Sequence, residues 1–387
     1  MYKRQVKDNT EESGVKFEDY GIYTQVEQLN KTALKSHGLD SNGQLYKINS
    51  FEFYRYEDII KKEDDAGYDK TAFEKMLEIK GDSDHTKLID MLTDLNDYSI
   101  GIEDVLKEHF DEENIVYWMA FQILMGNVDT QNRNVYLYSP LNSDIWYFIA
   151  WDNDGCLMRP EYELRNFSDQ NSWEKGISNY WGNILFQRCL KSRSFREKLN
   201  DAILDLREYL NKDMLTSKIE SYKNVLKPYL YLMPDAEYEP LTSEQYDQIA
   251  ASLPDEIEKN YQLYLESLET PMPFYIGVPS IDGDKLKFNW DVSYDLDAED
   301  ITYSVEVARD YLFQDVIYQN TTLTVPESEM ELPNAGQYFV RVRATNTSGK
   351  TQDAFDYYVT DEGKHYGMKC FYITEDSTVE EDNYEEG

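Results

Sequence analysis

One polar segment organises the first half of the sequence: Gly126-Asn-Val-Asp-Thr-Gln-Asn-Arg-Asn134 follows the longest apolar run of the chain, Ile115–Met125. That run predicts a central helix, buried on nearly all faces, with Asp111 as its N-cap and Gly126 as its end. Two runs rich in aromatic and β-branched residues come next, at Asn134–Tyr138 and Trp146–Trp151. They predict a hairpin of short strands, so the polar segment is a loop between a buried helix and a hairpin.

The remainder of this half alternates between short strands and helices. Tyr20–Val26 has the composition of a buried strand, and Lys31–His37 that of a short helix. Apolar residues at near-alternating positions over Leu45–Tyr56 indicate a second strand or hairpin arm. Helical spacing of apolar residues predicts helices over the segments Asp69–Ile79, Asp84–Asp94 and most of Trp181–Leu268.

A different pattern begins after Thr270–Pro273, where near-strict alternation predicts strands separated by turns. These strands are Leu286–Trp290, Tyr303–Ala308 and Tyr338–Ala344. The change of pattern divides the chain into a mostly helical part with short strands and an all-β part. The expected fold class is therefore α+β.

The all-β part resembles a fibronectin type III domain, a sandwich of the immunoglobulin type, over residues 273–360. Trp290 would lie in the core between two sheets, and Leu332 followed by Tyr338 is similar to the tyrosine corner of such sandwiches. The last segment, 361–387, turns polar and acidic, so it is expected to be a disordered tail.

The charge of the chain limits its partners. Among 387 residues, 75 are acidic and 38 basic, which gives a net charge of −37. A field of this sign repels phosphate backbones, so no nucleic acid is expected as a partner. The run Ile115–Met125 contains Gln122 and is shorter than the about 20 residues of a transmembrane helix, so no membrane span is predicted.

Two acidic elements flank the predicted hairpin. Asp129 and Asn134 have the spacing of the catalytic-loop Asp and Asn of protein kinases, in which the Asp orients the substrate hydroxyl and the Asn holds a metal ion. Asp152 and Asp154 follow the second strand, where a kinase has its metal-binding Asp. Carboxylate oxygens suit Mg²⁺, and substrate phosphates complete its shell. The order predicts Asp129 as the catalytic residue and the other three as ligands of Mg²⁺ or Mn²⁺.

Five segments resemble the CotH kinase family, which is named for a spore coat protein. They are Gly126-Asn-Val-Asp129, Arg133-Asn-Val-Tyr-Leu-Tyr138, Trp146-Tyr-Phe-Ile-Ala-Trp-Asp-Asn-Asp-Gly155, Gly21-Ile-Tyr-Thr-Gln-Val-Glu-Gln-Leu-Asn-Lys31 and Gly43-Gln-Leu-Tyr-Lys47. The resemblance covers residues 15–270 and implies a mostly helical, kinase-like C-lobe. The sequence departs from the family at Asn153, where an apolar residue is expected between the two acids.

The resemblance implies an atypical protein kinase that uses ATP and a divalent metal to phosphorylate Ser or Thr hydroxyls of surface or spore-coat proteins. It implies a location outside the cell or in the spore coat of a Gram-positive bacterium. The segment Glu27-Gln28-Leu29 falls where a kinase hinge binds adenine through its backbone. Nothing before Tyr20 resembles the family's strand-rich N-lobe, so that lobe is expected to be largely missing. Lys47 either supplies a compensating phosphate contact or is a solvated strand-edge residue.

Three other interpretations stay open. A chain without its nucleotide lobe would suit a pseudokinase that acts as a structural or adhesive protein through its sandwich. Paired carboxylates beside a fibronectin-like module also occur in carbohydrate-active enzymes, although that interpretation gives Asn134 no role. The segment Asp152–Glu163 has the end residues of a calcium loop, but Leu157 stands where the turn of such a loop needs Gly.

Overall fold

The chain folds as two compact units, which are described separately. The computed structural model describes residues 2–7, 17–164, 173–361 and 363–382. The first unit comprises Met1–Phe167 and Ser192–Lys259, and the second comprises Ser168–Lys191 and Asn260–Gly387.

The second unit starts before the boundary that the sequence predicts near Pro273. Helix α11 (Glu256–Glu269) crosses the division, and its C-terminal half is bonded within the second unit. Ile177 donates its backbone N–H to Ser267 Oγ at 3.0 Å, and Asn346 donates its side-chain amide to the carbonyl of Glu269 at 3.0 Å. Strand alternation along the sequence gives no sign of these helix contacts.

A four-stranded antiparallel sheet lies in the first unit, in the order β4-β3-β5-β6. Its strands are Leu77–Ile79 (β4), Gln44–Ile48 (β3), Val135–Ser139 (β5) and Tyr147–Ala150 (β6). The sequence predicted β5 and β6 as a hairpin, and the structure has it. The predicted strand from Leu45 ends early, at Ile48, and the segment after it turns at Phe53 and Tyr56, whose φ angles are 64° and 39°.

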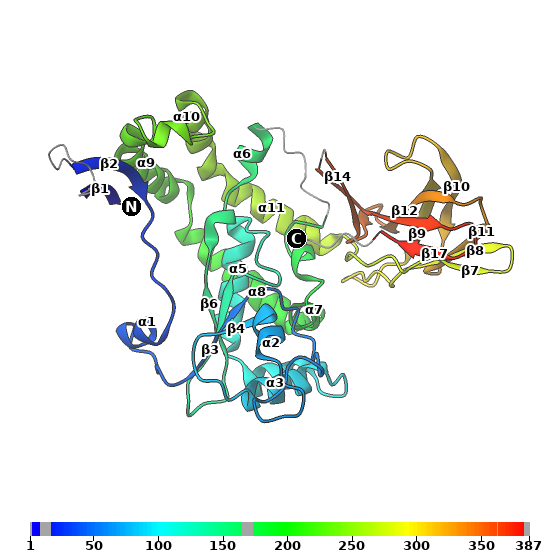
Figure 1. Cartoon of the computed structure of the whole chain (residues 1–387), viewed down its shortest axis with the longest axis horizontal. Coiled ribbons are helices and arrows are strands. Elements are labelled where there is room, and N and C mark those ends of the chain that lie inside the picture. The colour runs from blue at the N-terminus through cyan, green and yellow to red at the C-terminus, as the bar shows by residue number, and fades with distance from the viewer. Residues whose placement is uncertain (1, 8–16, 165–172, 362, 383–387) are drawn as a thin grey trace. The chain divides into compact units, whose positions relative to one another are not determined.

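Helix α5 (Glu112–Met125) is the buried helix expected before the polar loop. Asp111 caps it by accepting a hydrogen bond from the backbone N–H of Asn114 at 2.9 Å. Gly126 ends it in the left-handed conformation, with φ of 61°. In Figure 1, α5 lies beside β6 and α8 (Arg193–Tyr209), and it contacts both. The polar loop therefore leaves a packed helix and enters a packed strand.

The first unit contains further helices of various lengths. They are α1 (Lys31–Ser36), α2 (Lys70–Met76), α3 (Thr86–Asn96), α4 (Ile102–His109), α6 (Arg159–Leu164), α9 (Lys212–Leu230) and α10 (Ser243–Ser252), with 3₁₀ turns η1 (Asn153–Gly155), η3 (Asp235–Glu237) and η4 (Leu253–Asp255). The predicted helix Asp69–Ile79 is shorter than expected, because its last three residues form β4, where Leu77 pairs with Ile48. Within the described ranges, no helix is both long and apolar enough to cross a bilayer.

The strand predicted at Tyr20–Val26 is present as β2 (Phe17–Tyr23), but the prediction that it is buried is wrong. β2 pairs with β1 (Tyr2–Lys7) in a two-stranded sheet. The side chains of Tyr20 and Tyr23 are exposed at 42% and 44%. Aromatic and β-branched residues favour strands wherever one face is covered, so the composition of this segment did not predict how far its side chains are buried.

Antiparallel strands form most of the second unit. One sheet has the order β10-β9-β12-β16-β17 with β13 paired to β12, another has the order β11-β8-β7, and β14 pairs with β15. The strands are Ser280–Asp282 (β7), Lys285–Asn289 (β8), Ile301–Ala308 (β9), Val316–Leu323 (β10), Glu327–Glu331 (β11), Gly336–Asn346 (β12), Thr351–Asp353 (β13), Tyr357–Thr360 (β14), Gly363–Tyr366 (β15), Met368–Ile373 (β16) and Val379–Glu381 (β17). Helix α7 (Ile184–Lys191) and the turn η2 (Ser178–Tyr180) belong to the same unit.

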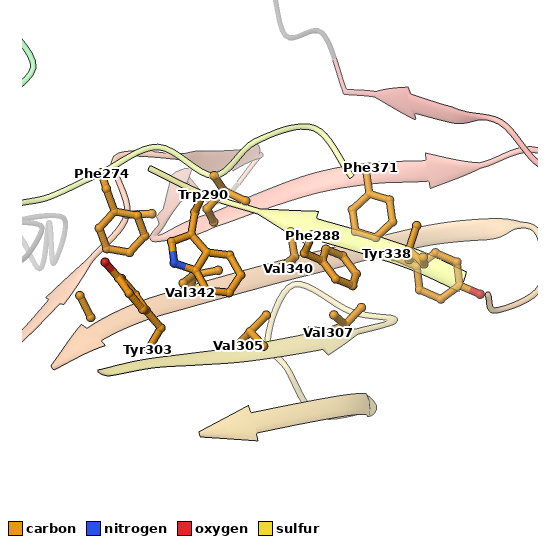
Figure 2. Packing of buried hydrophobic residues seen from close by; sticks show 14 of the residues in the cluster. Phe274, Phe288, Trp290, Tyr303, Val305, Val307, Tyr338, Val340, Val342 and Phe371 are labelled. Carbon is orange, nitrogen blue, oxygen red and sulfur yellow. The ribbon is translucent and has the colours of Figure 1, made fainter. Parts of the chain in front are cut away.

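The two larger sheets share one apolar core, shown in Figure 2. Phe288 of β8 and Val305 of β9 both lie in this core, as does Trp290, which is only 5% exposed. Tyr338 donates its hydroxyl to the carbonyl of Asn334 at 2.7 Å, which is the hydrogen bond of a tyrosine corner. The chain is thus an α+β protein, and the fibronectin type III assignment of this unit stays a prediction.

The expected disordered tail is wrong for most of its length. Of the segment 361–387, residues 363–382 are described and contain β15, β16 and β17, whereas 362 and 383–387 lie outside the described residues. Phe371 of β16 is fully buried in the core of the unit. Apolar residues at Met368, Cys370 and Ile373 supply the buried positions of this strand, and the acidic residues around them hid the pattern.

Candidate active site

The polar loop brings Asp129 and Asn134 into contact. The side-chain amide of Asn134 donates to a carboxylate oxygen of Asp129 at 2.7 Å and to its backbone carbonyl at 3.1 Å. Arg133 Nε lies 3.6 Å from the other carboxylate oxygen. About half of the Asp129 side chain is exposed, at 51%. The carboxylate is therefore held from two sides and still open to a substrate.

Burial raises the pKa of Asp129, and the carboxylates of Asp154 and Asp152 raise it further. The guanidinium of Arg133 and the hydrogen bond from Asn134 oppose this rise. A carboxyl group with a raised pKa is a better proton acceptor once it is ionised.

The loop after β6 carries those two acids on a strained backbone. Asp152 has φ of 52° and ψ of 62°, a left-handed conformation that few residues other than Gly adopt. The 3₁₀ turn η1 then carries Asp154, and both carboxylates are exposed. Strain of this kind persists where the surrounding structure imposes it, and it is frequent at functional sites.

Gly155 allows the acidic loop to touch the polar loop. A Cβ at this position would lie 2.7 Å from Asn127 Oδ1 and 3.8 Å from Asp129 Cβ. The first distance is shorter than side chains tolerate, so Gly is required for the two loops to approach this closely.

The oxygen donors around Asp129 are of the type that Mg²⁺ prefers. Asn134 uses its amide nitrogen on Asp129, which leaves its amide oxygen for a cation. In the described part of the chain, no group of three or more His, Cys, Asp or Glu side chains is arranged to hold a metal ion. Mg²⁺ commonly takes one or two carboxylates and completes its shell with water and phosphate oxygens, so a site of two acids and one amide fits it.

The four residues predicted to bind ATP fall into two sets. Lys47 lies on β3 opposite Tyr136 of β5, and Leu29 packs on the same face of the sheet. That face carries an apolar cluster, made of Leu29, Leu34, Leu45, Tyr136, Tyr138, Tyr147, Ile149 and Trp151. Trp151 directly precedes Asp152, so the cluster adjoins the acidic loop.

Glu27 and Gln28 are both exposed, beside helix α1. Glu27 accepts hydrogen bonds from His37 at 2.8 Å and from Ser36 at 3.4 Å, so its side chain holds the helix. Residues 24–29 belong to no helix or strand, which leaves an extended backbone next to the apolar cluster. The calcium-loop interpretation has no support in this geometry, because the described residues hold no group of three or more acidic, His or Cys side chains placed to bind one ion.

Sequence reasoning did not assign a role to three amide residues at the site. Gln122 of α5, Asn127 of the polar loop and Asn153 of the acidic loop are hydrogen-bonded to one another. A polar residue in an otherwise apolar helix was the sign that could have identified Gln122.

One of three comparisons with known proteins identifies a family. The family described as "CotH kinase protein" matches residues 5–264. A comparison with curated proteins gives no match. Among solved structures, the "Twitchin kinase region from C.elegans (Fn31-NL-kin-CRD-Ig26)" is 16% identical, with 24% of this chain and 20% of that chain covered and a TM-score of 0.19. This chain thus spans about a fifth of that structure, and a likeness at this score carries no argument. Because the family match covers well over half of its residues, the chain belongs to the CotH kinase family.

Proposed function

We propose that the chain is a protein kinase that transfers the γ-phosphoryl group of Mg²⁺-bound ATP to a Ser or Thr hydroxyl of a protein. The observation that carries the proposal is the half-exposed carboxylate of Asp129, held by Asn134 and flanked by the acids of the second loop. In the transfer, the bond from the γ-phosphorus to the β,γ-bridging oxygen breaks, and a bond to the substrate oxygen forms. The hydroxyl proton passes to Asp129, and ADP leaves.

Each side chain has a distinct task in this proposal. Asp129 orients the hydroxyl and accepts its proton, and the hydrogen bond from Asn134 fixes the carboxylate in one orientation. Asp152, Asp154 and the amide oxygen of Asn134 would hold the cation. The bound Mg²⁺ or Mn²⁺ neutralises the phosphate charge. Phosphoryl transfer depends mainly on such positioning and charge neutralisation.

The nucleotide is proposed to lie against the apolar cluster. Tyr136 and Trp151 pack there with ring centroids 5.3 Å apart, and Trp151 leads directly into the acidic loop. A flat base beside these rings would keep its phosphates near Asp152. The backbone of Glu27-Gln28-Leu29 would hydrogen-bond the base, and Lys47 would reach a phosphate.

The protein substrate is proposed to be a surface or spore-coat protein, and the location to be the cell surface or spore coat of a Gram-positive bacterium. Both rest on membership of a family named for a spore coat protein. The net charge of −37 is consistent with a neutral or basic substrate segment, because an acidic one would be repelled.

Nucleotide binding tests the proposal against the pseudokinase alternative. Mg²⁺ with ATP should raise the melting temperature of the full chain, and labelled phosphate should move from [γ-³²P]ATP to a protein acceptor such as casein. Asp152→Ala should lose both the stabilisation by Mg²⁺ with ATP and the phosphate transfer, because the variant lacks a proposed cation ligand. Asp144→Ala, an exposed acid in the turn of the same hairpin, is the matched control and should keep both. Binding without transfer to any acceptor would favour the pseudokinase, and neither binding nor transfer would refute the nucleotide site.

A further inference from the structure

Gln122 is a polar residue in the last turn of the apolar helix α5. Its neighbours Met119, Ala120 and Ile123 are buried, and Gln122 itself has no exposed surface. Burying an amide costs free energy unless both its donor and its acceptor find partners. The partners of Gln122 come from the two loops of the site, not from the helix.

Three side-chain amides close a ring of hydrogen bonds. Gln122 Nε2 donates to Asn153 Oδ1 at 3.1 Å, and Asn127 Nδ2 donates to Gln122 Oε1 at 3.0 Å. Asn127 Nδ2 also lies 3.3 Å from Asn153 Oδ1. We call these three residues the amide ring. Each comes from a different segment, namely helix α5, the polar loop and the acidic loop.

The ring connects directly to the residues that carry the chemistry. Asn127 Oδ1 accepts a hydrogen bond from the backbone N–H of Asp129 at 3.4 Å. Asn153 stands between the two acids of the other loop, so fixing Asn153 fixes the backbone on which both are mounted. The backbone N–H of Leu157 donates to the carbonyl of Met125 at 2.8 Å, which ties the far end of the acidic loop to the same helix.

We infer that Gln122, Asn127 and Asn153 are positioning residues, which hold Asp129 and the two acids of the neighbouring loop at the separation that phosphoryl transfer requires. The inference rests on the proposed kinase activity for its effect on rate. None of the three side chains bonds a site carboxylate, so they act through the backbone of the two loops. A misplacement of about 1 Å in such a site can lower a rate about 100-fold.

The test uses the full chain with Gln122→Met, Asn153→Ala and the double variant. Gln122→Met keeps the length and apolar packing of the side chain but removes the amide. Gln44→Met is the matched control, because Gln44 is a buried Gln of the same unit whose amide donates to the carbonyl of Asp84, away from both loops. Asn153→Ala changes an exposed position, so it reports on the ring even if Gln122→Met does not fold.

Kinase assays give the first measurement. Each single variant should lower kcat by about 10- to 100-fold and raise the Mg²⁺ concentration for half-maximal rate several-fold. A loss of folded protein lowers the rate but does not move this Mg²⁺ concentration. The double variant should be no slower than the slower single variant, because the residues act as one unit. An unchanged Mg²⁺ concentration in both single variants, or losses that multiply, would overturn the inference.

Amide hydrogen exchange gives a second measurement that needs no activity. In Gln122→Met, exchange should quicken in residues 127–134 and also in residues 152–157, whereas Gln44→Met should leave both loops unchanged. If the wild-type chain transfers no phosphate, the proposed function fails, and exchange still tests the ring. Unchanged exchange in both loops of Gln122→Met would refute the inference whatever the activity.

Discussion

Asn134 and Asp129 form one unit, in which the amide nitrogen of Asn134 lies 2.7 Å from the carboxylate of Asp129. Asn134 itself has φ of 57°, a left-handed conformation that turns the chain so that its side chain reaches back across the loop. The five-residue spacing therefore corresponds to a loop that the Asp129–Asn134 hydrogen bond closes. In this arrangement, Nδ2 of Asn134 bonds the carboxylate of Asp129, and Oδ1 of Asn134 is left to bind a cation.

Removing the side-chain amide of Asn134 should change both the phosphotransfer rate and its dependence on Mg²⁺ concentration. Asn134→Ala frees the Asp129 carboxylate and deletes a proposed cation ligand, so the phosphotransfer rate should fall by about 100-fold or more. The measurement is the initial rate of phosphate transfer as a function of Mg²⁺ concentration. Asn142→Ala, an exposed residue in the turn of the neighbouring hairpin, is the control and should leave the rate unchanged. A rate within twofold of wild type for Asn134→Ala would remove this residue from the site.

His85 should make the first unit less stable in mild acid. The imidazole ring is fully buried and stacks on Phe73, with ring centroids 4.2 Å apart. Its Nδ1 forms a hydrogen bond with the Tyr46 hydroxyl at 2.8 Å. Burial lowers the pKa of His85, against the opposing charges of Glu63, Asp84 and Asp82.

The lowered pKa of His85 determines how stability changes with pH. The unfolded chain protonates His85 near pH 6.5 while the folded chain still excludes the proton, so stability present above that pH is lost as the pH falls toward the lowered folded pKa. Urea unfolding at pH 7.5, 6.5 and 5.5 should show a stability gap between wild type and His85→Gln that narrows with acid. A constant gap for His85→Gln would contradict the account.

The buried ion pair of Arg159 and Glu256 should be important for the stability of the first unit. Arg159 Nη1 lies 3.0 Å from Glu256 Oε2, and the side chains are 16% and 1% exposed. Breaking a buried pair leaves an uncompensated charge and costs about 3–5 kcal/mol, so Glu256→Gln should lower the free energy of unfolding on that scale. Glu74→Gln, in the exposed pair with Lys70, should cost at most about 1 kcal/mol. Equal losses for the two variants would show that burial of the first pair has no energetic consequence.

The strands beyond residue 361 should be necessary for the second unit. Phe371 is fully buried in the core between the sheets, so Phe371→Ala should destabilise the unit by about 3–5 kcal/mol. Val292→Ala, at a side chain that is 73% exposed, should change stability little. The check is chemical unfolding followed by tryptophan fluorescence, to which Trp290 of this core contributes. No loss of stability in Phe371→Ala would restore the disordered tail that the sequence suggested.

Local features of the site were predictable from the sequence, because residues close together in the chain determine them. The apolar run with Asp111 before it and Gly126 after it predicted the bounds of α5 within a residue. The spacing of Asp129 and Asn134 indicated a loop of the kinase type, and in the structure the two side chains are hydrogen-bonded across that loop. Such features need no knowledge of the remainder of the fold.

Features that depend on distant residues were not predictable in this way. Gln122 and Asn153 meet across 31 positions, and Phe371 packs against Phe288, which lies in strand β8 far earlier in the chain. The burial expected for Tyr20 failed for the same reason, since composition does not say what covers a strand. Tertiary partners decide burial and polar pairing, and they are not encoded within a short window of sequence.

The rate of phosphate transfer by Asp129→Asn tests the central claim most directly. This variant keeps the size of the side chain and removes its capacity to accept a proton, so transfer should fall by about 100- to 10,000-fold while Mg²⁺ and ATP still stabilise the protein. Asp144→Asn, the same change at an exposed turn, should transfer phosphate at the wild-type rate. Transfer by Asp129→Asn at the wild-type rate would contradict the assignment of this loop as the catalytic centre.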